Sequence, residues 1–175
     1  MATAYISLLR GINVSGKNKI KMSALADLYF NLGFSDVSTY IQSGNVVFHY
    51  TESDTNMLAK SIKNGIKEKL GLDIEVIVKS LSDLEYVVNK IPFADKRTYI
   101  TFLSKPPETI PYDELKKVKQ DSESLAILND VVYFLCPDGY GKTKLSNNFL
   151  EKQFGAAATT RNYKTVSKLL ELAKL

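Results

Sequence analysis

Side chains suited to binding an anion occur in four short stretches of this chain. Arginine and lysine carry a positive charge at neutral pH, and asparagine and glutamine offer amide N–H donors that can orient an oxygen. The candidate residues are Arg10, Asn13, Gln42, Asn45, Lys144 and Arg161. We expect the three cations to hold a phosphate or carboxylate group and the three amides to orient it. The leading hypothesis is therefore a protein that binds a small anionic ligand.

The elements that carry these residues are expected to form an α+β protein with two ferredoxin-like (alpha-beta plait) lobes, each with an antiparallel sheet. Apolar residues at helical or alternating spacing give the order βαββαβ in residues 1–80, the first lobe. The order βαββα returns in residues 81–175, the second lobe, which carries extra C-terminal helices. A capping box at residues 82–85 opens its first helix. A final helix from about Asn162 is expected in place of the last strand.

The predicted strand order brings two of the candidate stretches to one edge. In a ferredoxin-like lobe the order is 4-1-3-2, so the end of the first strand lies beside the hairpin between the second and third. Residues 10–13 and the two-residue turn Ser43-Gly44 would lie about 9.5 Å apart, which is two strand spacings. The first helix, with Ser23 as its N-cap, would point its free N–H groups to the same edge. Because no carboxylate occurs from Arg10 to Lys21, the sequence predicts an anion site where no acid competes.

Two candidate cations precede predicted helices of the second lobe. Lys144 lies just before a helix capped by Ser146, and Arg161 lies just before the last helix. The N-terminal end of a helix favours anions. We expect these helix starts to face the loops of the first lobe across the lobe boundary, so that all six candidates line one cleft between the lobes.

Other chemistries have weaker support in the sequence. Gly141-Lys142-Thr143 resembles the end of a phosphate-binding P-loop, but Cys136 stands where that motif requires glycine. Cys136 lies in an apolar strand and is predicted to be a buried thiol, not a nucleophile. His49 has no acid at a recognisable motif spacing and is predicted to be structural. One Cys and one His cannot build a usual zinc site. No metal or cofactor is expected, and catalytic residues stay unassigned.

The distribution of charge indicates the kind of partner. The 175 residues contain 23 Lys and Arg against 19 Asp and Glu, a net charge of +4. The excess of cations is concentrated in residues 10–21 and 142–168, and this favours anionic partners. Binding of nucleic acid through a basic face is the main alternative. It is less favoured, because Asn45 and Val47 occupy strand positions where RNA-recognition modules carry stacking aromatics. An interaction module without a small ligand is the third alternative, and the oligomeric state is open.

Composition indicates the class of protein. Hydrophobic residues make up 45% of the chain and charged residues 24%, which is typical of a folded globular protein. No apolar run reaches the length of a membrane span, and the first residues lack the pattern of a secretory signal. A cytoplasmic protein is therefore expected. The single cysteine excludes a disulfide within the chain.

Four long stretches together resemble the bacterial domain-of-unknown-function family numbered 1697. They are residues 10–22, 39–48, 140–146 and 159–169. The resemblance extends from the first strand to the last helix. It implies two ferredoxin-like lobes, and it implies no established activity, substrate or catalytic residue. Tyr163 stands where the family often has Trp.

Overall fold

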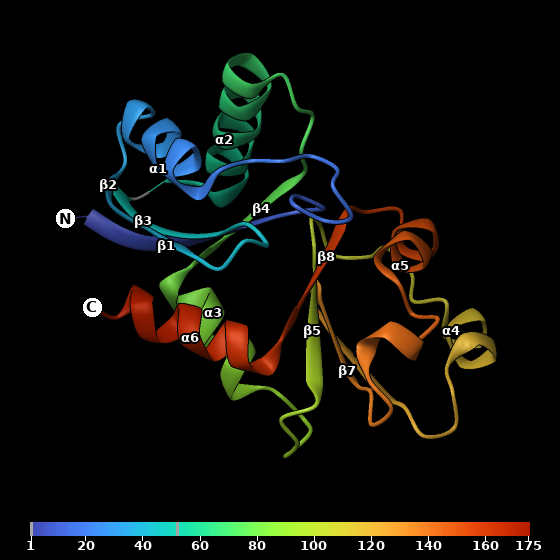
Figure 1. Ribbon diagram of the computed structural model, residues 1–175. Helices are drawn as coiled ribbons and strands as arrows, with labels where there is room; N and C mark the ends of the chain where they lie inside the picture. The colour runs from blue at the N-terminus through green and yellow to red at the C-terminus, as the bar shows by residue number, and fades with distance from the viewer. Residues whose placement is uncertain (1, 52) are drawn as a thin grey trace. The chain divides into compact units, whose positions relative to one another are not determined.

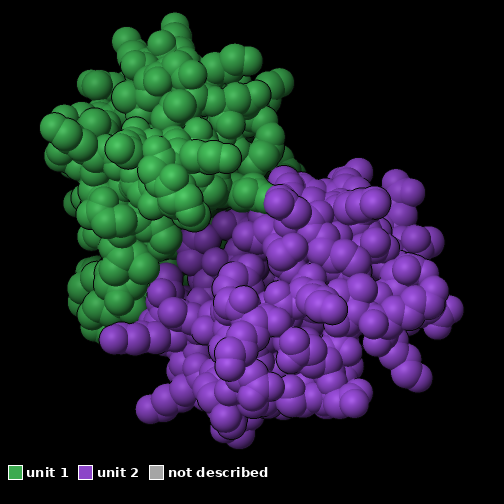
Figure 2. Space-filling model, turned by 45° about the vertical axis from the view of Figure 1, so that its right-hand side comes forward, with its two compact units in different colours: residues 1–86, 168–175 green, residues 87–167 purple. Residues whose placement is uncertain are grey.

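The computed structural model describes residues 2–51 and 53–175, which form two four-stranded antiparallel sheets and six α-helices (Figure 1). The protein is thus of the α+β class. The chain divides into two compact units, coloured separately in Figure 2. The first unit comprises Met1–Tyr86 and Lys168–Leu175, and the second comprises Val87–Ser167. These units differ from the expected domains 1–80 and 81–175 at the boundary and in the last eight residues.

The first unit contains one sheet with two helices against it. Its elements are β1 (Ala2–Leu9), α1 (Met22–Asn31), β2 (Ser35–Tyr40), β3 (Asn45–Thr51), α2 (Thr55–Leu70) and β4 (Val76–Ser80). The sheet has the order β2-β3-β1-β4, and every neighbouring pair is antiparallel. This is the 4-1-3-2 order that the sequence predicts. Both helices lie on one face of the sheet (Figure 1).

Aromatic side chains fill the space between these helices and the sheet. Tyr5 of β1 stacks on Phe48 of β3, with ring centroids 5.7 Å apart. Tyr29 of α1 meets Phe48 edge-on at 5.4 Å, and its hydroxyl lies 2.6 Å from Ser7 Oγ. Burial raises the pKa of Tyr29. These contacts fix the sheet against α1, and the loop that leads from β1 into α1 is anchored at both ends.

The second unit repeats the pattern of the first. Its elements are β5 (Thr98–Leu103), α4 (Tyr112–Val118), β6 (Ser124–Leu128), β7 (Val131–Leu135), η1 (Tyr140–Lys142), α5 (Asn147–Phe154) and β8 (Ala158–Asn162). Two helices, α3 (Leu81–Asn89) and α6 (Tyr163–Ala173), carry residues of both units. The sheet order is β6-β7-β5-β8, again antiparallel throughout. Leu115 of α4 and Leu150 of α5 pack on one face of it.

The strand β8 corrects the prediction that a helix replaces the last strand. Residues 158–162 pair with β5 in antiparallel register, with Thr160 opposite Thr101 and Arg161 opposite Ile100. The two threonine hydroxyls lie 2.7 Å apart across this pair. Cross-strand threonine pairs stabilise a sheet, and β-branched residues favour strands. The second unit therefore has the same order of elements as the first.

Three local predictions are wrong by one or two residues. Ser23 does not cap α1, because the helix begins at Met22 and its cap residue is Lys21. The reciprocal cap of α3 is formed by Ser80 and Asp83, with Ser80 Oγ accepting from the Asp83 N–H at 3.1 Å and Asp83 Oδ2 accepting from the Ser80 N–H at 3.3 Å. The turn between β2 and β3 has four residues, 41–44, not two.

Two further predictions agree with the structure. Ser146 caps α5, its Oγ accepting from the Phe149 N–H at 3.2 Å. Gly71 ends α2 in the left-handed conformation, as its place after Leu70 predicts. In the part of the chain that the structure describes, no helix has the length and apolar composition needed to cross a membrane.

Candidate functional site

Three of the six candidates, Arg10, Asn13 and Gln42, belong to one edge of the first unit, and Asn45 begins β3 next to it. We call this region the loop edge; it consists of the β1–α1 loop, residues 10–21, and the β2–β3 turn, residues 41–44. Asn13 holds its parts together. Its Nδ2 donates to the carbonyl oxygens of Ile20 at 3.0 Å and Gln42 at 2.9 Å, and its Oδ1 accepts from the Ile20 N–H at 2.8 Å. Asn13 is therefore a positioning residue.

Asn45 has a similar role beneath the β2–β3 turn. It is fully buried, and its Nδ2 donates to the Tyr40 carbonyl at 3.0 Å and to Ser43 Oγ at 2.9 Å. The turn also contains Ile41 with a φ of 49°. A β-branched residue in the left-handed region is strained and needs support from its surroundings. The amide of Asn45 supplies part of that support, while the Gln42 side chain stays exposed.

Gly44 seats this turn on the end of β1. Its φ is 85°, and a Cβ placed on it would lie 2.7 Å from Leu9 Cβ and 2.8 Å from Ile12 Cδ1. The Leu9 N–H donates to the Gly44 carbonyl at 2.8 Å. Only glycine combines this conformation with this close approach. The predicted meeting of the β1 end with the β2–β3 turn is therefore observed.

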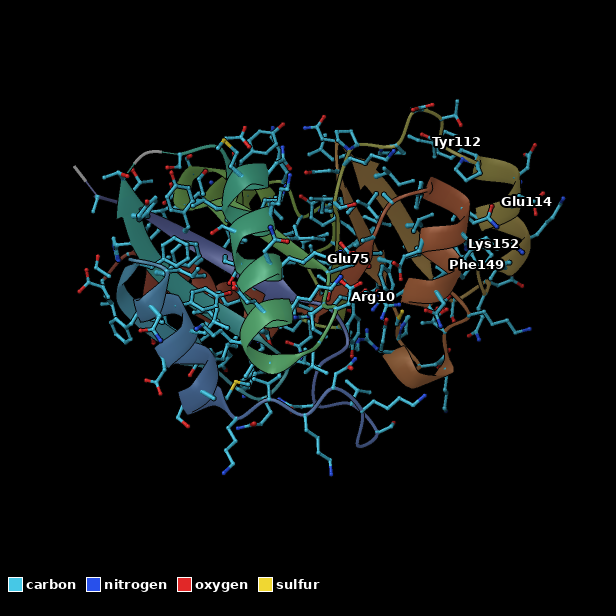
Figure 3. The ribbon with its side chains drawn as sticks, turned by 90° about the horizontal axis from the view of Figure 1, so that it is seen from above. Arg10, Glu75, Tyr112, Glu114, Phe149 and Lys152 are labelled. Atoms are coloured by element: carbon cyan, nitrogen blue, oxygen red, sulfur yellow. The ribbon has the colours of Figure 1, made fainter. Side chains whose placement is uncertain are left out.

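Arg10 lies where β1 ends, and an acid accompanies it. The Arg10 N–H donates to the Glu75 carbonyl at 2.9 Å, and the two side chains are labelled beside each other in Figure 3. The Glu75 carboxylate accepts a hydrogen bond from Lys63 Nζ, and this bond raises the pKa of Lys63. The expectation that no acid competes at this edge is wrong, because Glu75, which immediately precedes β4, pairs with Arg10 through the backbone although it is far from residues 10–21 in sequence.

The remaining cations of the loop edge are Lys17, Lys19 and Lys21, all exposed. Within the described residues their side chains make no ion pair. The loop beneath them is ordered: Asn18 Nδ2 donates to the Gly11 carbonyl at 3.0 Å, and the Asn13 N–H donates to the Asn18 carbonyl at 3.1 Å. These lysines lead directly into α1.

The N-terminus of α1 lies at the end of this lysine-containing loop. The helix has neither a side-chain cap at Lys21 nor an acidic residue in its first turn. The N–H groups at a helix start have no partner inside the helix, and the helix dipole adds positive potential there. Because Ser23 was predicted to cap α1, the uncapped start of this helix was not predicted. The signal that could have found it is the run of three lysines with no acid nearby.

Arg161, in the second unit, is part of the strand β8. It is 8% exposed, and its Nη1 donates to Thr159 Oγ1 at 2.7 Å and to the Thr160 carbonyl at 3.0 Å. Burial lowers the pKa of Arg161 to about 10, against a smaller upward effect of Tyr140. Arg161 precedes the last helix, as predicted, and the start of that helix is capped, because Asn162 Oδ1 accepts from the Thr165 N–H at 2.8 Å.

Lys144 is exposed and lies two residues before the cap of α5. Beside it, Asn147 Oδ1 accepts from Thr160 Oγ1 at 2.6 Å and so joins α5 to β8. The structure brings Asn13, Gln42 and Asn45 together at the loop edge, with Arg10 beside them. It places Lys144 and Arg161 in the second unit. A single cleft that contains all six residues stays a prediction.

Two surface hollows of the second unit are formed by other residues. One is lined by parts of 105–109 and 152–155, beside the end of α5. Another is lined by residues 93–96 and Tyr163. Neither contains Lys144 or Arg161, so these hollows give no support to the candidate cations of this unit.

The single thiol and the single imidazole have structural surroundings. Cys136 is buried, as predicted, and its Sγ lies 3.8 Å from Glu123 Oε1. Burial, with a smaller effect of the Glu123 charge, raises the pKa of Cys136 to about 11, which makes it a poor nucleophile at neutral pH. His49 Nδ1 lies 3.8 Å from Asp36 Oδ2 of the neighbouring strand β2, beyond hydrogen-bond distance, and among the described residues it has no hydrogen-bond partner. Within residues 2–51 and 53–175, no three His, Cys, Asp or Glu residues are grouped as metal ligands would be.

Comparison with known proteins shows the family of this chain. A comparison with curated proteins found no match. A solved structure, described as that of the conserved bacterial protein SP0830 from Streptococcus pneumoniae, is similar over 99% of both chains, with 27% sequence identity and a TM-score of 0.76. The family model described as "Protein of unknown function (DUF1697)" matches residues 2–133. The chain therefore belongs to the DUF1697 family.

Proposed function

We propose that this protein binds a phosphate- or carboxylate-bearing small molecule at the loop edge of the first unit. The observation that carries the proposal is the uncapped N-terminus of α1 at the end of a lysine-rich loop. An anion placed there accepts from the first N–H groups of the helix and lies near Lys17, Lys19 and Lys21. We also infer that each unit is a ferredoxin-like plait, which the order 4-1-3-2 in both sheets supports.

The roles of the candidate residues differ in this proposal. Asn13 and Asn45 hold the two segments in place, because their amide groups are engaged in hydrogen bonds to the backbone and to Ser43. Gln42 is exposed beside them and can donate to the ligand. Arg10 adds positive potential, reduced by the nearby Glu75. The exposed lysines attract the anion, and the helix start orients it.

Calorimetric titration with pyrophosphate and with citrate tests the proposal. The test variant replaces Lys17, Lys19 and Lys21 with alanine. The control replaces Lys105, Lys116 and Lys117, which are exposed lysines of the second unit. Both variants lose the same charge, so a difference between them reports a site and not the net charge. We expect at least a tenfold loss of affinity in the test variant and little change in the control. Equal loss in both variants, or no binding by the unaltered protein, would overturn the proposal.

Titration with single-stranded nucleic acid tests the alternative ligand. The affinity for a single strand would fall steeply as the salt concentration rises, because each phosphate contact releases counterions. Tyr5, the aromatic residue of β1, is 2% exposed, and its hydroxyl accepts from the Ser53 N–H at 2.9 Å, so it offers no base a stacking surface. We expect single strands to bind more weakly than about 10⁻⁶ M at physiological salt.

A further inference from the structure

The two sheets have four outer strands, and each outer strand presents backbone N–H and C=O groups that its sheet does not use. These strands are β2 and β4 in the first unit and β6 and β8 in the second. Natural proteins protect such edges with bulges, charged side chains or proline, because an unprotected edge pairs with a strand from another chain. The four edges can therefore be compared for protection.

Three of the four edges carry a protective feature. The pairing of β2 with β3 shifts register between Ser35 and Ser38, and Asp36 has a φ of 49° within this shift. The strand β4 carries the inward-lying Lys79, which is 8% exposed. On β8, Arg161 donates to the carbonyl of Thr160 in its own strand. Each of these three edges therefore has an irregular backbone or a buried charged side chain, and such features disfavour an added strand.

The strand β6 has none of these features. Its residues pair with β7 in unbroken register from Ser124 to Leu128. Its sequence, Ser-Leu-Ala-Ile-Leu, contains no charge and no proline, and all five residues are half-buried. In an antiparallel strand alternate residues turn their N–H and C=O groups away from the neighbour. In the described part of the chain, no other segment hydrogen-bonds to this outer side.

We propose that β6 pairs with β6 of a second copy of this chain, in antiparallel orientation about a two-fold axis at Ala126. Leu125 then lies opposite Ile127 of the partner subunit, and the two second-unit sheets become one continuous sheet. Leu125 and Ile127 already pack against the core of the second unit, so the pairing extends an apolar face.

A second copy fits this edge better than an unrelated peptide. The strand is neutral, so pairing with itself places no like charges opposite each other, a contact that would destabilise the sheet. It also offers no charge with which to select a different partner. A two-fold contact of this kind closes on itself and does not continue into a filament. Because one pair of five-residue strands is smaller than a standard interface, we expect a weak dimer that forms with increasing concentration.

Sedimentation velocity from micromolar to near-millimolar concentration tests the proposal. Ala126→Lys places two ammonium groups side by side at the axis, and Ser124→Lys adds a charge nearer the end of the strand. The matched control is Ser38→Lys, the same change on the edge strand β2, where Ser38 is exposed. We expect the unaltered protein and Ser38→Lys to form dimers at high concentration, and both β6 variants to stay monomeric.

Hydrogen exchange of the unaltered protein tests the proposal without any variant, so a variant that fails to fold cannot affect the result. The amides of alternate β6 residues should exchange more slowly as the concentration rises, while those of β2 should not change. A protein that stays monomeric at every concentration overturns the proposal. So does a dimer whose β6 amides gain no protection, or a dimer that persists in both folded β6 variants.

Discussion

Replacing Gly44 with alanine tests whether the β2–β3 turn is as closely seated on β1 as the structure indicates. The new Cβ would lie 2.7 Å from Leu9 Cβ and 2.8 Å from Ile12 Cδ1, well inside van der Waals contact. Leu9 and Ile12 are both fully buried, so neither can move aside without disturbing the core. The residue must also keep a φ of 85°, a conformation that disfavours alanine.

These two effects give the expected magnitude. A left-handed alanine costs about 1–2 kcal/mol, and an extra methyl group in a packed core costs about 1–3 kcal/mol. We therefore expect Gly44→Ala to lower the free energy of unfolding by about 2–5 kcal/mol. For a chain of this length the melting temperature falls by about 2–4 °C for each kcal/mol, which gives a loss of roughly 4–20 °C. Thermal unfolding followed by circular dichroism measures it.

Gly33→Ala is the matched control, because it separates backbone strain from the clash. Gly33 has almost the same φ, 86°, but a Cβ there would meet no atom within 4 Å. We expect this variant to lose only the conformational part, about 1–2 kcal/mol. The difference between the two variants is then the free energy of the clash with Leu9 and Ile12. Equal losses would refute the close seating, and the loop edge would need a different geometry.

Three further predictions concern polar side chains with defined surroundings. Cys136 should react slowly with iodoacetamide at neutral pH and faster as the pH rises toward 11, because burial raises its pKa to about 11; rapid reaction of the folded protein at pH 7 would contradict the structure. Stability should fall as the pH rises above about 10, because the unfolded state releases the Tyr29 proton more readily than the folded state. Tyr29→Phe should remove the part of this decline that comes from Tyr29. It should also lower the free energy of unfolding at neutral pH by about 1–3 kcal/mol, because Ser7 loses its partner at 2.6 Å. Asn13→Ala removes three hydrogen bonds and should lower the free energy of unfolding by about 1–3 kcal/mol. The same change should weaken pyrophosphate binding. Unchanged binding would show that Asn13 does not position the loop edge.

Much of the fold could be predicted because it depends on local patterns. The alternation of apolar residues identifies seven strands, and glycine or proline marks many of their ends. The strand β8 escaped prediction because Thr159, Thr160 and Arg161 offer no apolar alternation. Pairing with β5 decides their conformation, and β5 lies more than fifty residues earlier in the chain. The cap of α3 was wrong by two residues because Ser80 and Ser82 have the same local preference.

The candidate site could be predicted only in part. The strand order places residues 10–13 beside 42–45, and this meeting depends on topology alone. Whether Asn13 faces a ligand or the backbone depends on its left-handed conformation, with a φ of 53°, which no local pattern fixes. The approach of Glu75 to Arg10 follows from the same strand order, because the antiparallel pairing of β4 with β1 brings the start of β4 to the end of β1. Glu75 escaped prediction because the charge pattern of residues 10–21 alone does not include it.

At the loop edge, some residues hold the two segments in place, and other groups stay exposed without such a role. Asn13 and Asn45 use their amide groups to hold the β1–α1 loop and the β2–β3 turn, and Gly44 allows the two segments to touch. These structural roles account for the sequence motifs around them. The exposed lysines and the uncapped start of α1 have no comparable role in holding the fold. Because a rigid frame around exposed donors lowers the entropy lost on binding, we infer that the frame serves the lysines and the helix start, which are the groups that would touch an anion.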